Sequence, residues 1–329
     1  MFNENSIRPI NLIKESKKFQ NLDINFLKSK KFFFIKSSCP ACDSDKKIFF
    51  MHKKTFKYFK CTKCETIYIS PRPTEKILDE FYKNSTYYKF WHSYIFPATE
   101  KSRIRNIFYP RVKRIIHYVN KFKIKRNGIV DIGAGYGTFL EIFKKNFFFK
   151  KVYAIEPNND GADCCKKKNI IVFNKRVEKI NKNDLKGVSV ATSFEVIEHL
   201  YSPKKFLKLL KKILPKKSLL VITCPNGLGF DLLTLKNKAD NFDHEHLNYF
   251  NPKSIDILLK KNGFKILEIL TPGNLDVDIV VNKIKEKKYK SKNNFLDIIF
   301  NNNLLKISFQ KYLKNNCLSS SLWVVAQKI

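Results

Sequence analysis

Four of the eight cysteines are spaced as ligands of one metal ion. Cys39 and Cys42 form a first Cys-x-x-Cys turn, and Cys61 and Cys64 form a second one after eighteen intervening residues. Each turn directs two thiolates to one side of a metal, so two turns complete a tetrahedral shell for zinc. Four thiolates leave no open position for water or substrate, which makes the expected role structural. The spacing therefore predicts a small zinc ribbon over residues 37–70.

A glycine-rich loop is the second place where chemistry is expected. Asp131 precedes it, and the loop itself consists of Gly133, Ala134, Gly135, Tyr136 and Gly137. Glycines permit a tight turn and let backbone amides approach a ligand closely at a helix N-terminus. A nicotinamide-binding fingerprint needs a glycine at position 138, where the sequence has Thr138. The loop is therefore typical of a nucleotide-like cofactor site other than an NAD site.

An acidic residue follows the next apolar run. Glu156 ends that run and is followed by Pro157 and Asn158. A carboxylate at this position accepts two hydrogen bonds from a ribose diol. The alternative is a surface glutamate that merely closes a strand.

Strands and helices alternate around these motifs. Apolar runs typical of buried parallel strands lie at 128–132, 152–155, 170–173, 188–192 and 219–223. One helix is expected to begin at Ser202 and Pro203, and another after Pro252. Further strands are expected at 264–270 and 322–326. This pattern predicts a doubly wound, Rossmann-like α/β sheet of about seven strands.

Four segments are expected along the chain. A Lys-rich, loosely held leader covers residues 1–36, and the zinc ribbon covers 37–70. A helical connector that caps a pocket covers 71–126. The α/β domain covers 127–329 and carries a Lys-rich insertion near 283–316.

Composition limits the class of protein. A hydrophobic content of 43% indicates a packed globule, and the sequence contains no run of about twenty apolar residues that would cross a membrane. The first twenty residues do not resemble a signal peptide, so we expect a cytoplasmic protein. The net charge of +35 suggests a nucleic-acid partner. The alternative is compositional drift, because only eight of the 64 basic residues are Arg and Asn, Ile and Phe are abundant, as an AT-rich gene produces.

The motifs together resemble the class I S-adenosylmethionine-dependent methyltransferases. An acidic residue at 131 with glycines at 133, 135 and 137 matches their D/ExGxGxG motif, and residues 194–200, which read FEVIEHL, look like the small-molecule branch that includes ubiquinone-biosynthesis enzymes. The resemblance implies that S-adenosylmethionine is the cofactor. It implies contacts to its methionine part from Asp131 and the glycine loop, to its ribose from Glu156, and to its remaining groups from Pro157, Asn158, Val177, Ser193 and Phe194.

Three histidines are candidates for a general base, because a hydroxyl acceptor must lose a proton when it is methylated. His199 follows the fourth strand, or it only bonds to backbone at a helix start. His244 and His246 stand at alternate positions, where an extended chain directs both side chains to one face. Metal binding by this segment is a further alternative, although the i, i+4 spacing of familiar zinc enzymes is missing. Glu195 would orient the acceptor or cap a helix.

A zinc ribbon ahead of this domain resembles methyltransferases of surface-polysaccharide and modified-sugar synthesis. The expected function is methyl transfer to a small molecule, a sugar or a surface-glycan precursor. The alternative is an rRNA or tRNA methyltransferase, since zinc ribbons also precede rRNA guanine methyltransferases. Against it, the fourth strand does not end in the (D/N)PP(Y/F) motif that stacks a flipped base. A non-catalytic zinc-ribbon adaptor is the third alternative.

Overall fold

The computed structural model describes residues 3–291 and 294–329. Its central sheet has seven strands in the order β10-β11-β8-β7-β4-β5-β6. The strands are β4 (Gly128–Ile132), β5 (Lys151–Ile155), β6 (Ile171–Phe173), β7 (Val190–Phe194), β8 (Leu219–Pro225), β10 (Phe264–Leu270) and β11 (Ser321–Lys328). The strands β6, β5, β4, β7 and β8 run parallel, and β11 and β10 are antiparallel at the edge. The predicted seven-stranded Rossmann-like fold is confirmed.

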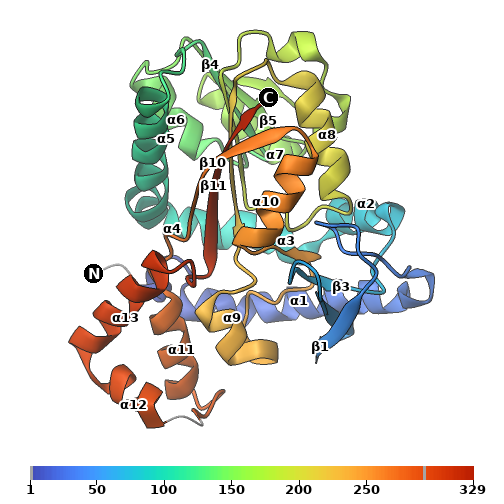
Figure 1. Cartoon of the computed structure of the whole chain (residues 1–329), viewed down its shortest axis with the longest axis vertical. Coiled ribbons are helices and arrows are strands. Elements are labelled where there is room, and N and C mark those ends of the chain that lie inside the picture. Colours follow the sequence, from blue (N-terminus) through green and yellow to red (C-terminus); the bar gives the residue numbers. More distant parts are fainter. Residues whose placement is uncertain (1–2, 292–293) are drawn as a thin grey trace.

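Helices cover both faces of this sheet (Figure 1). One face carries α5 (Tyr109–Lys121), α6 (Thr138–Lys145) and α7 (Asn159–Lys167), and the other carries α8 (Pro203–Ile213) and α10 (Pro252–Lys261). Successive side chains of each strand point to opposite faces of the sheet, so that Ile129 packs in the core on one face and Val130 in the core on the other. The helix starts are as predicted: Ser202 accepts a hydrogen bond from the Lys205 amide, and Asn251 caps α10.

A second, four-stranded sheet holds the cysteines. Its order is β1 (Lys47–Lys53), β2 (Phe56–Cys61), β3 (Ile67–Ile69) and β9 (Asn248–Tyr249). The four Sγ atoms lie within 4.8 Å of one another, and the distances are 3.4 Å from Cys39 to Cys64 and 3.6 Å from Cys42 to Cys61. Tetrahedral zinc at ~2.3 Å from each sulfur requires sulfurs about 3.8 Å apart. The geometry therefore fits the predicted zinc ion.

The ribbon shares its core and its sheet with the α/β domain. β3 pairs with β9, which lies almost two hundred residues later, so that Ile67 faces Tyr249. The Asn251 side chain donates a hydrogen bond to the carbonyl of Cys64 at 3.0 Å. The cysteines themselves pack in the same core as the α8–α10 face of the large sheet. The ribbon thus holds β9 and Asn251, which lie just before α10, in place.

The N-terminal segment differs from the loosely held leader that the sequence predicted. Residues 10–29 form the helix α1 (Ile10–Ser29), which crosses the lower half of Figure 1 at the height of β3. Its outer surface is rich in lysine, and its buried side includes Asp23, Ile24 and Leu27. Asp23 accepts hydrogen bonds from Ser85 and Thr86, at the start of the connector helix α3 (Thr86–Phe90). Residues 1 and 2 of the predicted leader lie outside the described residues.

The remaining helices lie around this frame. The connector contains α2 (Glu75–Asn84), α3 (Thr86–Phe90) and α4 (Phe96–Arg103), with π-helical turns at Trp91–Ile95 and Ile104–Phe108. The later part of the chain contains α9 (Phe230–Leu235), α11 (Asp276–Lys285), α12 (Asn294–Asn301) and α13 (Asn303–Asn315). α11 to α13 lie where the Lys-rich insertion was expected, and residues 292 and 293 of that insertion lie outside the described part. Short 3₁₀ turns occur at Glu4–Ser6, Lys31–Phe33, Val177–Lys179, Lys182–Leu185 and Lys236–Lys238.

Among residues 3–291 and 294–329, none of the helices combines the length and apolar character needed to cross a membrane.

The shared sheet leads to a prediction about the metal. Replacing Cys64 with serine should abolish zinc binding, lower the melting temperature by more than about 5 °C, and loosen residues 243–250, because β9 loses an ordered partner. Zinc analysis, a melting curve and amide hydrogen exchange measure the three effects. Cys317→Ser, which changes a half-buried thiol outside the cluster, should leave all three unchanged. Unaltered exchange at 243–250 in the Cys64 variant would show that the two units are independent.

Candidate active site

A cavity of about 2260 Å³ opens at the carboxyl ends of the parallel strands. Open α/β sheets bind their ligands at this edge. Its lining brings together most of the residues that the sequence singled out, including Asp131, Gly135, Glu156, Phe194, His199 and His246. The helices α1, α3 and α4 contribute further wall, so the predicted cap over the pocket includes the N-terminal helix as well as the connector.

The glycine loop joins β4 to α6 on one side of the cavity. Gly135 has a φ of +54°, and a Cβ built on it would meet no atom within 4 Å, so its backbone faces open space. α7 approaches the loop closely, because a Cβ on Gly161 would lie 2.9 Å from the carbonyl oxygen of Gly135. Tyr136 reaches the connector and donates a hydrogen bond to the carbonyl of His92 at 2.6 Å. The loop thus presents bare backbone to a ligand and is held from both sides.

Glu156 lies at the end of β5 beside this loop. Its carboxylate is only 4% exposed and accepts hydrogen bonds from the amides of Gly135 at 2.7 Å and Asn158 at 2.9 Å. Burial raises the pKa of Glu156, and these two amides oppose that effect. Each carboxylate oxygen retains a further lone pair, and the residue lines the cavity. Glu156 therefore shapes the glycine loop and can still accept hydrogen bonds from a diol.

Asp131 is the second carboxylate on this side. It is 4% exposed and accepts a hydrogen bond from the Thr192 hydroxyl at 2.6 Å. Burial raises the pKa of Asp131 to about 7, against the effects of Thr192 and of the Arg111 guanidinium. A cationic ligand group beside it would compensate for the burial of its charge.

The other residues predicted to contact a cofactor divide into two groups. Ala134, Tyr136, Pro157 and Phe194 line the cavity with those already described. Gly137, Asn158, Val177 and Ser193 are not part of its lining. Gly137 and Asn158 instead precede α6 and α7 as their N-caps, and Val177 packs in the core beneath α8. Their predicted contacts to a cofactor remain expectations from the resemblance.

A histidine wall, formed by Tyr82, His199, Glu245 and His246, lines another part of the cavity. The Nδ1 atom of His199 lies 3.1 Å from the carbonyl oxygen of Glu245, and Nδ1 of His246 lies 2.9 Å from that of Asn241. A carbonyl only accepts, so each Nδ1 carries the proton and each Nε2 keeps its lone pair. Burial lowers the pKa of both imidazoles, to about 3 for His199. Each Nε2 is therefore available to a proton or to a cation.

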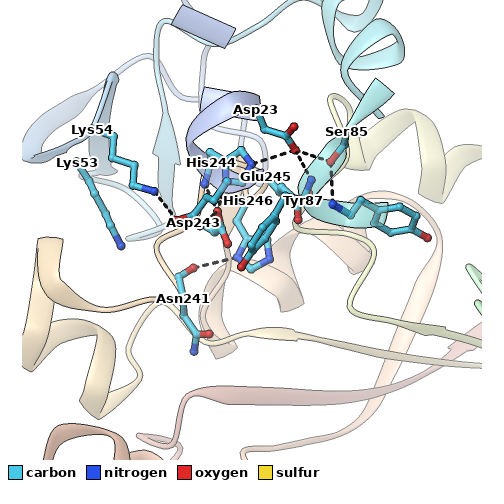
Figure 2. A network of polar contacts seen from close by, with 12 residues as sticks. Asp23, Lys53, Lys54, Ser85, Tyr87, Asn241, Asp243, His244, Glu245 and His246 are labelled. Atoms are coloured by element: carbon cyan, nitrogen blue, oxygen red, sulfur yellow. Dashed lines mark hydrogen bonds and ion pairs between the residues drawn. The ribbon is translucent and has the colours of Figure 1, made fainter. Parts of the chain in front are cut away.

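His244 does not share the face of His246, contrary to the prediction. The chain bends at His244 and Glu245 and is not extended there. His244 is buried outside the cavity lining, between the carboxylates of Asp243 and Asp23, with its Nε2 3.8 Å from Asp23 (Figure 2). Although burial disfavours the charged form, Asp243 and Asp23 raise the pKa of His244 to about 10. His244 thus forms a cationic link between α1 and the histidine wall.

Two glutamates after β7 and Arg111 on α5 complete the site. Glu195 has a φ of +55° and accepts hydrogen bonds from Thr223 at 2.6 Å and from Arg111 at 3.2 Å. Arg111 also lies over the Phe194 ring, at 4.5 Å. Glu198 is completely buried and lines the cavity, and neither of its carboxylate oxygens has a hydrogen-bond partner. The sequence analysis did not single out Glu198, although the spacing Glu-x-x-Glu-His within 195–199 could have drawn attention to it.

Comparisons with known proteins give one family and several solved structures. A family model described as a methyltransferase domain matches residues 104–269. A search of curated proteins found no match. A SAM-dependent methyltransferase from Archaeoglobus fulgidus is 21% identical, with 72% of this chain and 100% of that chain covered and a TM-score of 0.46. An S-adenosylmethionine-dependent methyltransferase from Clostridium acetobutylicum is 12% identical, with 74% and 98% covered and a TM-score of 0.48. The plantazolicin methyltransferase BpumL, solved in complex with SAH and a pentazolic desmethylPZN analog, is 15% identical, with 77% and 94% covered and a TM-score of 0.48.

The raised pKa of Asp131 gives a test of the site without any ligand. A carboxyl whose pKa is about 7 in the folded chain and ~3.9 in the unfolded chain lowers stability as pH rises from about 4 to 7. We therefore expect Asp131→Asn to raise the melting temperature at pH 8 and to leave it unchanged at pH 4. A melting curve at both values measures this difference.

The matched control is Asp163→Asn, because Asp163 is exposed on α7 and paired with Lys166. The Lys166 ammonium lowers the pKa of Asp163, so this variant should not gain stability at pH 8. An equal change at pH 4 and pH 8 in the Asp131 variant would contradict the assigned burial of its charge.

Proposed function

Since the chain belongs to the methyltransferase domain family, and is an S-adenosylmethionine-dependent methyltransferase, we propose that it methylates a small molecule, namely a sugar or a surface-glycan precursor. One observation carries this proposal. A single cavity connects the glycine loop and Glu156 with the histidine wall, and helices from both ends of the chain enclose it. Such a site encloses a small acceptor and keeps water from the reacting atoms.

The residues beside the glycine loop suit the cofactor. S-adenosylmethionine supplies a methyl group on a sulfonium centre when it is bound. The lone pairs of Glu156 would accept hydrogen bonds from its ribose hydroxyls, and the bare backbone at Gly135 allows close approach. Asp131 would face its cationic methionine part, which offsets the cost of a buried carboxylate.

The acceptor would lie against the histidine wall. Tyr82, His199, Glu245 and His246 present polar atoms for hydroxyl groups, and they lie in the same cavity as the cofactor residues. The neutral Nε2 atoms of His199 and His246 fulfil one requirement of the general-base role expected from the sequence. His244 would act by positioning, through its ion pairs with Asp243 and Asp23.

Lysines also line the cavity. Lys14, Lys17, Lys53, Lys54 and Lys283 are among the residues of its lining, and Lys283 pairs with Asp240. A cluster of ammonium groups favours an acceptor that carries a carboxylate or a phosphate. Activated sugars with a phosphate group have this chemistry, which supports the saccharide reading.

An RNA acceptor is the second candidate, and the net charge of +35 favours it. The two readings give different results when the protein is incubated with methyl-labelled S-adenosylmethionine and bulk rRNA and tRNA. We expect no label above background in the nucleic acid, because the helices α1, α3 and α4 form part of the cavity wall and restrict the entry of a polynucleotide. Stable incorporation of label into RNA would replace the proposed acceptor.

Glu156 provides the test of cofactor binding. Glu156→Ala removes the expected acceptor of two hydrogen bonds, each charge-assisted and worth ~1.5–3 kcal/mol, so we expect S-adenosylhomocysteine to bind at least roughly 10-fold more weakly by calorimetry. Glu141→Ala is the control, because Glu141 lies on α6 and pairs only with Lys145 and Lys168 among the ion pairs of the described residues. Equal affinity in the wild type and the Glu156 variant would show that the ribose binds elsewhere.

A further inference from the structure

The buried carboxylate of Glu198 is the least satisfied charged group of the cavity. It is 0% exposed, and both of its oxygens lack a hydrogen-bond partner. A buried carboxylate without compensation costs several kcal/mol. Burial and the Glu195 carboxylate raise the pKa of Glu198, and the Arg111 guanidinium, which opposes them, donates its hydrogen bond to Glu195. A cation bound beside Glu198 would compensate for the burial of its charge.

Two imidazoles lie beside this carboxylate. The Nε2 atom of His199 is 3.9 Å from Oε1 of Glu198, which is too far for a hydrogen bond. Glu198, His199 and His246 each offer one ligand atom, and these three atoms lie within 4.8 Å of one another. Two ligands at about 2.1 Å from a common ion are roughly 3 Å apart at a right angle and about 4.2 Å apart when opposite. The observed separation of 3.9 Å falls in this interval.

The hydrogen bonds of the imidazoles favour metal binding over a simple ion pair. His199 and His246 each direct Nδ1 to a backbone carbonyl, of Glu245 and Asn241 respectively, which fixes Nε2 as the free lone pair (Figure 2 shows the contact of His246 with Asn241). This is the arrangement that orients histidine ligands in metal sites. A second group, Asp23, His244 and Glu245, is also close enough for a metal. However, the oxygens of Asp23 already accept hydrogen bonds from Ser85, Thr86 and Tyr87.

We propose that Glu198, His199 and His246 bind one divalent metal ion in the wall of the cavity. Two imidazole nitrogens and one carboxylate suit manganese, iron, cobalt or zinc, and they leave coordination positions open toward the cavity. This site differs from the closed four-thiolate site of the ribbon. The open positions would take oxygen atoms of the acceptor, such as the hydroxyls of a sugar.

The consequence for catalysis rests on the proposed function. A metal-bound hydroxyl loses its proton more readily, because the cation stabilises the alkoxide. His199 and His246 would then serve as ligands, and the proton would pass to the Glu245 carboxylate, which also lines the cavity. The acceptor class is correspondingly one with an oxygen donor at or next to the methylated atom.

Manganese alone is the probe, because thiolates of the ribbon prefer zinc and oxygen–nitrogen sites accept manganese. The full chain with its ribbon zinc retained is titrated with Mn²⁺, and free ion is counted by electron paramagnetic resonance. We expect one Mn²⁺ per chain, with spin-echo modulation from imidazole nitrogen. Glu198→Gln, which has the same shape, and His246→Ala should each weaken binding at least tenfold.

His92→Ala is the matched control. His92 also lines the cavity, and it stands outside the three-residue cluster. It should keep the affinity of the wild type for Mn²⁺. If His246→Ala fails to fold, Glu198→Gln alone tests the proposal. This variant should fold, because glutamine has the same size as glutamate and removes the buried charge.

Two results would overturn the proposal: absence of bound Mn²⁺ in the wild type, or equal affinity in Glu198→Gln. Calorimetry with S-adenosylhomocysteine separates this outcome from failure of the proposed function. Loss of metal binding with normal cofactor affinity in Glu198→Gln supports the metal site. A wild type that binds Mn²⁺ with imidazole coordination and no cofactor keeps the metal site and contradicts the proposed function.

Discussion

The pairing of β3 with β9 fixes the position of the histidine wall. β9 is two residues long, follows His246 almost directly and is held along the edge of the ribbon by its pairing with β3. Asn248 in this strand accepts a hydrogen bond from Arg72 at 3.3 Å and donates one to the carbonyl of Leu200 at 2.8 Å. One short strand thereby joins the ribbon, the connector and the loop after β7. This strand therefore links the folding of the four-cysteine ribbon to the position of the cavity wall.

The part of the cavity beside the glycine loop and the histidine wall is rich in carboxylates. The chain carries a net charge of +35, yet Asp131, Glu156, Glu195, Glu198 and Glu245 converge on one cavity. Burial raises the pKa of Asp131, Glu156, Glu198 and Glu245, because it disfavours the charged form of each carboxyl. Cations are the natural complement of such a site. A sulfonium cofactor on one side and a metal ion on the other would both meet this need.

Most of the fold could be predicted from short sequence patterns. The strands at 128–132 and 264–270 have the predicted bounds, and Ser202 begins α8, because alternating apolar residues and helix caps act over a few residues. The cysteine cluster and the glycine loop could also be predicted, because metal binding and cofactor binding at these sites depend on residues a few positions apart. Three features could not be predicted from the sequence. Helix α1 appeared polar, because Asp23 and Ser16 make up half of its buried residues. The orientation of His244 depends on Asp23, which is far away in sequence, and Glu198 is left without hydrogen-bond partners only by the tertiary fold.

The contact between α1 and the histidine wall also bears on how the chain becomes folded. Gln20 on α1 donates a hydrogen bond to Asp243, and these residues are 223 positions apart. During synthesis, α1 can first pack on α3, whose Ser85 cap lies 62 positions after Asp23. The side of α1 that contacts Asp243 and His244 stays uncovered until those residues have been made. The wall is therefore among the last parts to become ordered, and the protein acquires its activity only near the end of its own translation.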